Sequence, residues 1–257
     1  MFTRGRFCAD HRSMGSTERQ MQEESRRVMV IAAHPDDFEL TCAGTVAGWM
    51  HQGWQARLVL VTSGDKGTAN ATASLTTTAQ QVLSQREEEQ QAAAAVLGLS
   101  DVVYLRYPDG ELFPTMDLRR ALAHQIRLFR PQRLFTHDPW RPYQLHPDHR
   151  ATGTAALDAV ASARDPLFFP DQLTEGVTAW RVGDIYLFAS AWPDTFVDVS
   201  ETFELKLAAL HKHAGQMAGM PGMEQRLREM ATEYGKRIGA RYAEAFKLIT
   251  VTIYPDL

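Results

Sequence analysis

The sequence has only two cysteines, Cys8 and Cys42, and they form neither a C-x-x-C pair nor a disulfide framework. Such sparse cysteine usage favours a reducing compartment, and we therefore expect a cytoplasmic protein. No apolar run approaches the roughly 18 residues that indicate a membrane span. The net charge of −4 includes no basic excess, so we expect no nucleic-acid partner.

The beginning of the chain also lacks the apolar core of a secretory signal. We predict that residues 1–26 form a mobile N-terminal leader and that residues 27–257 form one domain. A chain of 257 residues with 44% hydrophobic residues can bury a sizeable core.

Strand-like and helix-like segments alternate from Val28 to Ala163. Strands are predicted over 28–33, 57–62, 102–105 and 133–137, and helices over 37–51, 79–97, 117–130 and 149–163. This alternation is typical of an α/β protein, and we predict a Rossmann-like, doubly wound, mostly parallel sheet with helices on both faces. The later pattern is looser, with strands over 184–189, 196–199 and 245–254 and helices over 202–213 and 223–238.

The dinucleotide-binding pattern G-x-G-x-x-G is absent after the first predicted strand. The residues found there instead are Ala33-His34-Pro35-Asp36-Asp37-Phe38-Glu39, at the strand end where open α/β sheets bind their ligands. A second cluster, His146-Pro147-Asp148-His149, comes after the predicted strand 133–137. The two clusters can share a metal only if the fold brings both loops to the same edge of the sheet.

Imidazole and carboxylate groups are suitable Zn²⁺ ligands, and a catalytic zinc has three protein ligands and an open position for water. His34 and Asp37 stand at i and i+3 in the predicted turn between strand and helix. We interpret His149, which opens the predicted helix 149–163, as the third ligand. The same donors also suit other divalent metals such as Fe²⁺.

Three further residues of these clusters have side chains suited to catalysis. Asp36 stays free beside the metal, where a carboxylate can act as the general base toward water. We assign His146 to the oxyanion or the leaving amine. Asp148 is predicted to orient one of the histidines.

The predicted loops at the same sheet edge contain candidate substrate-binding residues. Asp65 and Lys66 lie in the long loop 63–78, and Asp109 follows the third strand. Arg141 and Tyr143 precede the second cluster and suit an anionic group and a sugar ring. The alternatives are a solvated loop for the first pair, a plain Pro-Asp-Gly turn for Asp109 and packing for the last pair.

The motif around His34 resembles the A-H-P-D-D-x-E motif of the PIG-L/LmbE-like deacetylases, and His146 to His149 resembles their H-x-D-H motif. The likeness runs from about Arg27 to the C-terminus. It implies a Rossmann-like fold, a catalytic zinc held by His34, Asp37 and His149, and N-deacetylation of acetylated amino sugars. It also implies Asp36 as the base and His146 at the oxyanion and leaving group.

The chain departs from the family pattern at two places. Gln144, beside Tyr143, stands where many members have a tyrosine, which makes Gln144 a further candidate for substrate binding. The family's late Lys…His-x-Ser-Gln pattern appears here as Lys206 and His213-Ala214-Gly215-Gln216, with glycine in place of serine.

We therefore expect a zinc-dependent amidase that removes an acetyl or small acyl group from the amine of an N-acetylated amino sugar or its conjugate. One alternative is an iron(II) oxygenase, since two histidines and one carboxylate also form the facial triad of such enzymes. Another is a non-catalytic sugar-binding protein on the same fold. The expected partner is a small-molecule substrate, and a homo-oligomer is compatible with the sequence.

Overall fold

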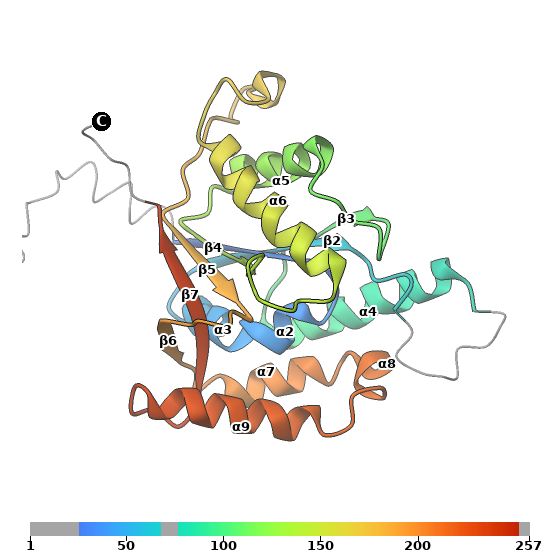
Figure 1. Ribbon diagram of the computed structural model, residues 1–257, viewed down its shortest axis with the longest axis vertical. Coiled ribbons are helices and arrows are strands. Elements are labelled where there is room, and N and C mark those ends of the chain that lie inside the picture. Colours follow the sequence, from blue (N-terminus) through green and yellow to red (C-terminus); the bar gives the residue numbers. More distant parts are fainter. Residues whose placement is uncertain (1–25, 68–76, 252–257) are drawn as a thin grey trace, which may run out of the picture.

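The computed structural model describes residues 26–67 and 77–251, and within these ranges seven strands form one sheet with helices on both faces (Figure 1). Most of the predicted leader lies outside the described residues. The strands are β1 (Arg27–Ala32), β2 (Gln55–Thr62), β3 (Val102–Tyr107), β4 (Arg133–His137), β5 (Asp184–Phe188), β6 (Thr195–Asp198) and β7 (Ala243–Thr250). The helices are α2 (Asp37–Thr41), α3 (Ala43–His51), α4 (Ala79–Leu97), α5 (Met116–Phe129), α6 (Pro147–Ala163), η1 (Pro170–Gln172), α7 (Phe203–Leu210), α8 (Ala214–Met217) and α9 (Met223–Lys236).

The strand order β3-β2-β1-β4-β5-β7-β6 confirms the predicted Rossmann-like architecture. The first five strands in this order are parallel to one another, and β7 runs antiparallel to both β5 and β6. From β1 the chain moves outward to β2 and β3, and then returns to place β4 on the other side of β1. The β1–β4 boundary is therefore a topological switch point, where sheets of this kind form a crevice for ligands.

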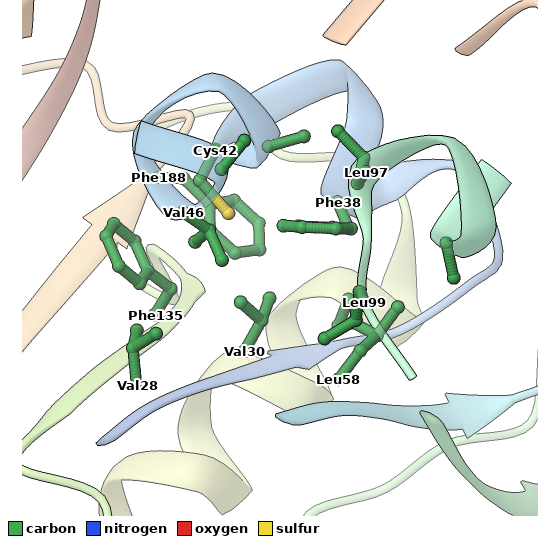
Figure 2. Packing of buried hydrophobic residues seen from close by; sticks show 14 of the residues in the cluster. Val28, Val30, Phe38, Cys42, Val46, Leu58, Leu97, Leu99, Phe135 and Phe188 are labelled. Atoms are coloured by element: carbon green, nitrogen blue, oxygen red, sulfur yellow. The ribbon is translucent and has the colours of Figure 1, made fainter. Parts of the chain in front are cut away.

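The alternation of side chains along β1 explains the layers. Val28 and Val30 pack on one face with residues of α2 and α3, and Figure 2 shows them in one cluster with Phe38 and Val46. Met29 and Ile31 point to the opposite face, which α5 and α6 cover. A further layer formed by α7 and α9 packs outside α2 and α3 (Figure 1). Helices on both faces leave the strand ends as the place for a site.

The predicted helix 37–51 is wrong in one respect, because the chain forms two helices that meet at Cys42. Glu244 of β7 explains the break. Its carboxylate accepts hydrogen bonds from the backbone N–H groups of Gly44 (3.0 Å) and Thr45 (2.7 Å), which mark the start of a second helix. A partner 200 residues away in sequence thus divides the helix.

Other boundaries differ by a few residues. The predicted helix 202–213 is also divided, into α7 and α8, and α6 begins at Pro147, so that Asp148 and His149 lie in its first turn. The predicted end of the last strand at Tyr254 lies outside the described residues. Within the part of the chain that the structure describes, no helix is long and apolar enough to cross a membrane.

Candidate active site

The two predicted clusters meet at the switch point of the sheet. β1 and β4 are paired neighbours, with Val28 opposite Arg133 and Val30 opposite Phe135. The turn that contains His34, Asp36 and Asp37 leaves the carboxyl end of β1, while the loop to His146 leaves the carboxyl end of β4. Parallel pairing therefore brings residues more than 100 positions apart to one edge.

Asp36 adopts an unusual backbone conformation, with φ of 94° in the left-handed region. Such a conformation is costly for a residue other than glycine and needs support from its surroundings. The buried Arg86 of α4 supplies support, since its Nη2 donates to the carbonyl of Pro35 (2.6 Å) and lies 3.5 Å from Asp36 Oδ2. Burial raises the pKa of Asp36 to about 6, although the charge of Arg86 opposes the shift.

The side chains of His34, Asp37 and His149 converge on one point. His34 Nδ1 and His149 Nε2 are 3.2 Å apart, His149 Nε2 and Asp37 Oδ1 are 3.2 Å apart, and His34 Nδ1 and Asp37 Oδ2 are 3.5 Å apart. Ligand atoms around a tetrahedral zinc with bonds of about 2.0–2.1 Å are separated by about 3.3 Å. These three residues therefore fit a zinc ion in number, chemistry and spacing.

Two buried carboxylates lie on the other side of the His34 ring. His34 Nε2 is 3.0 Å from Asp109 Oδ1 and 3.2 Å from Asp148 Oδ2. Burial lowers the pKa of His34, but its hydrogen bonds to these carboxylates outweigh that effect and raise the pKa well above its usual value. Asp148 is fixed in turn by the backbone N–H groups of Gly110 (2.7 Å) and Leu112 (3.2 Å). With Asp37, three carboxylates surround His34 and create a site that favours a cation.

His146 lies at the N-cap of α6 and is exposed. Its ring centroid is 4.6 Å from that of His34 and 4.6 Å from that of His149. One nitrogen of His146 also falls within 4.8 Å of donor atoms of these two histidines. Partial burial and the neighbouring histidines lower the pKa of His146, which favours a neutral ring.

The sequence interpretation missed His137, the last residue of β4. His137 is buried, its Nε2 lies 3.2 Å from Asp37 Oδ2, and the same nitrogen accepts the backbone N–H of Ala33 (3.2 Å). Burial lowers the pKa of His137 to about 4, so this ring stays neutral beside Asp37. The position of His137 in the sequence could have identified it as a site residue, since it stands at the carboxyl end of a predicted parallel strand.

The candidate substrate-binding residues are divided among the loops after β2, β3 and β4. The loops after β2 and β3 are joined, because Lys66 N–H donates to Asp109 Oδ2 (3.0 Å) and Asp109 N–H donates to Asp65 Oδ1 (3.3 Å). Asp109 itself is buried against His34, while the Lys66 ammonium pairs with Glu111 at the surface. Residues 68–76 of the long loop lie outside the described residues.

The loop between β4 and α6 is open to solvent. Arg141 is exposed, and Tyr143 is 96% exposed. Gln144 Oε1 accepts the backbone N–H of His146 (3.3 Å), so it supports the turn that leads into α6. Arg141 and Tyr143 therefore lie at the surface, whereas Asp109 reaches the buried cluster.

Comparison with known proteins identifies the family of the chain. Residues 29–160 match the family model described as PIG-L, GlcNAc-PI de-N-acetylase. A diacetylchitobiose deacetylase of Thermococcus kodakarensis is 32% identical over 226 residues, which cover 87% of this chain and 83% of that protein. A probable N-acetyl-alpha-D-glucosaminyl L-malate deacetylase 2 of Bacillus anthracis is 28% identical, covering 76% of this chain and 84% of its own length.

A solved structure agrees over nearly the whole chain. The N,N'-diacetylchitobiose deacetylase of Pyrococcus horikoshii, in complex with the inhibitor MPG, superposes with a TM-score of 0.82 and 28% identity. The match covers 95% of this chain and 98% of that one. The chain belongs to the PIG-L family of de-N-acetylases, and it is an enzyme that hydrolyses amide bonds.

Proposed function

We propose that this enzyme is a zinc-dependent N-deacetylase that removes an acetyl or small acyl group from an N-acetylated amino sugar or its conjugate. The observation that carries the proposal is the 3.2–3.5 Å spacing of donor atoms from His34, Asp37 and His149, with Asp36 directly before Asp37 in the chain. Family membership supports hydrolysis over the iron(II) oxygenase and the non-catalytic sugar-binding protein that the sequence left open.

In this proposal His34, Asp37 and His149 hold the metal. A zinc ion at such a site lowers the pKa of water to roughly 7 and polarises the acyl carbonyl. Asp36 takes the proton from the attacking water, and its burial supports this role because a pKa of about 6 suits a base that works near neutral pH. Arg86 keeps the Asp36 carboxylate in place.

His146 acts on the amide group that is cleaved, at its carbonyl oxygen or at its leaving nitrogen. Its ring is exposed and lies beside both His34 and His149, so a bound substrate can reach it. The lowered pKa of His146 favours a neutral ring, whose N–H can donate a hydrogen bond to the developing oxyanion, whereas only the cationic ring can pass a proton to the leaving amine. Asp148 and Asp109 orient His34, as carboxylates commonly do behind a metal-binding histidine.

The substrate class is inferred from the relatives and from the loops. The relatives are named for deacetylation of diacetylchitobiose and of an N-acetylglucosaminyl malate, both of which carry an acetylated amino sugar. In this proposal, sugar hydroxyls and rings are bound by polar and aromatic side chains of these loops, namely those of Asp65, Lys66, Arg141, Tyr143 and Gln144. A cytoplasmic location remains part of the proposal, and it agrees with the free thiol of Cys42.

The test is an amine-release assay with N-acetylglucosamine, its glycosides and diacetylchitobiose, using protein loaded with zinc. We expect turnover by the wild type and a loss of about 10²–10⁴-fold in kcat for Asp36→Asn, because the general base is removed. Zinc content should persist in Asp36→Asn and be lost in His149→Ala. Hydrolysis near the wild-type rate by Asp36→Asn with zinc bound would refute the assignment of the base.

A further inference from the structure

A second cluster of polar residues lies directly behind the catalytic turn and contacts no solvent. Glu39 of α2, Gln90 of α4 and His213, which precedes α8, are each 0% exposed. A fully buried carboxylate is costly unless charged or polar partners compensate it. The contacts of Glu39 therefore decide how the first turn of α2 is held.

The cluster forms a continuous chain of contacts that ends at Asp36. The backbone N–H of Asp36 donates to Gln90 Oε1 (3.3 Å), and Gln90 Nε2 donates to Glu39 Oε1 (2.8 Å). The other carboxylate oxygen, Glu39 Oε2, lies 3.2 Å from His213 Nε2. This last contact has the distance of an ion pair but not the angle of a regular hydrogen bond, so it acts mainly through charge.

His213 is held in this place by the docking of α8 on α4. The backbone N–H of Gly215 donates to Glu89 Oε1 (3.0 Å), and Gln216 Nε2 donates to the carbonyl of Gly67 (2.8 Å). A Cβ atom at position 215 would lie 3.0 Å from Nε2 of the exposed Gln85 and 3.3 Å from Glu89 Oε1, so a larger residue there would shift these two side chains. The α8 segment is thus fixed both to α4 and to the loop after β2.

The buried negative charges at the start of α2 explain why a cationic residue is needed at position 213. Asp36, Asp37 and Glu39 place three carboxylates within four positions, all of them buried. Metal-binding residues and Arg86 face the first two, whereas His213 is the cationic partner that faces Glu39. Burial lowers the pKa of His213, but the contact with Glu39 outweighs it and raises the pKa, in agreement with an ionic pair.

We propose that His213 is a positioning residue for the base: by neutralising Glu39, which Gln90 links to the backbone of Asp36, it holds Asp36 in the left-handed conformation in which this residue precedes α2. This inference rests on the proposed function of Asp36. His213 is too deeply buried to touch the substrate, so its effect on the reaction is indirect.

The test compares His213→Leu, which removes the donor, with His213→Gln, which keeps one. We expect kcat for the best amide substrate to fall about 10- to 100-fold in His213→Leu, with KM and zinc content close to the wild type. His213→Gln, which keeps an N–H donor but carries no charge, should recover only a small part of the loss, because the contact with Glu39 acts mainly through charge. Recovery of most of the loss by His213→Gln would overturn the ionic role. The matched control is His211→Leu, because His211 pairs with Glu224 (2.8 Å) at the surface of the same segment and should leave kcat unchanged.

A second comparison covers the case in which His213→Leu fails to fold. In the background of Glu39→Gln, where the side chain that faces His213 carries no charge, adding His213→Leu should change neither kcat nor the Tm of the metal-free protein. A further loss of kcat or Tm in that background would overturn the inference, as would a fall in zinc content parallel to the fall in kcat. The Tm comparison needs no substrate, so the Glu39–His213 coupling is measured even if no amide is hydrolysed and the proposed function fails.

Discussion

Cys42 lies at the junction of α2 and α3, where its thiol is completely buried. Burial, together with the nearby charge of Glu244, raises the pKa of this thiol well above its usual value. Since the thiolate is the reactive form, the folded protein should protect Cys42 from alkylation. We expect a Cys8→Ser variant to react with iodoacetamide only after unfolding in urea. Complete labelling in native buffer would contradict this description of the junction.

His137 contacts Asp37 Oδ2, whereas His149 contacts Asp37 Oδ1, and the two imidazole rings stack with centroids 4.2 Å apart. A neighbour that fixes two ligands affects how well they bind a metal. We expect His137→Phe to weaken zinc binding about 10- to 100-fold in a competition titration with a chelator. His51→Phe, on the exposed end of α3, is the control and should bind zinc as the wild type does. Equal affinities in the two variants would leave His137 without a role in the site.

At the residue scale, the sequence predicted which residues come together at the site, but it did not predict many of the individual contacts around them. The convergence of His34, Asp37 and His149 followed from the strand ends on which their clusters lie. The contact of Asp109 with His34 was not predicted, and its predicted role in substrate binding stays a prediction. The contacts of Arg86, Gln90 and His213 with the α2 turn depend on how α4 and α8 pack, and no local pattern in the sequence specifies that packing.

At the scale of elements, the break between α2 and α3 depends on a glycine. A Cβ atom at Gly44 would lie 3.0 Å from Glu244 Oε1 and 3.1 Å from Val199 Cβ, both of them buried. We expect Gly44→Ala to lower the free energy of unfolding by about 1–3 kcal/mol through overpacking, as measured by urea denaturation.

Gly48 provides the matched control within the same helix. A Cβ atom there would meet only Thr202 Cγ2, at 3.9 Å, which is an ordinary contact. Gly48→Ala should raise the free energy of unfolding by roughly 0.5–1 kcal/mol, because alanine loses less conformational entropy in a helix. Similar decreases in the free energy of unfolding in both variants would show that Glu244 does not determine the break between α2 and α3.

Apart from the short η1, the element types within the described residues were predicted, whereas some boundaries were not. The helix Ala79–Leu97 was predicted with its observed ends, and Thr78 with Gln81 forms a capping box at its start while Gly98 ends it. The break at Cys42 was missed because its cause, Glu244, belongs to the last strand. Local signals fix ends that local residues cap, and they fail where a distant side chain intervenes.

At the scale of the whole molecule, the metal site joins parts of the chain that are far apart in sequence. His34 and Asp37 follow β1, whereas His149 belongs to α6, and the unfolded chain does not hold them together. Zinc at 100 times its dissociation constant should therefore stabilise the folded protein by about 2.7 kcal/mol, which calorimetry can measure as a rise in Tm. His149→Ala should abolish the rise, and an equal rise in that variant would place the metal elsewhere.

The fold as a whole followed from the strand–helix alternation, because parallel strands need crossover helices. The antiparallel β7, placed between β5 and β6, did not follow, since the sequence after Ala163 has no regular alternation. This last part of the chain nevertheless provides Glu244 and His213, both of which contact residues near the site.

The left-handed backbone of Asp36 limits which residues can occupy its position. Asparagine and glycine tolerate that conformation, whereas alanine adds strain of roughly 1–2 kcal/mol. An alanine substitution would therefore remove the carboxylate and also distort the turn, whereas asparagine removes the carboxylate and keeps the turn. For the same reason, relatives that keep this turn but have lost hydrolysis are expected to carry asparagine or glycine there, so the type of residue at this one position should separate active from inactive members of the fold.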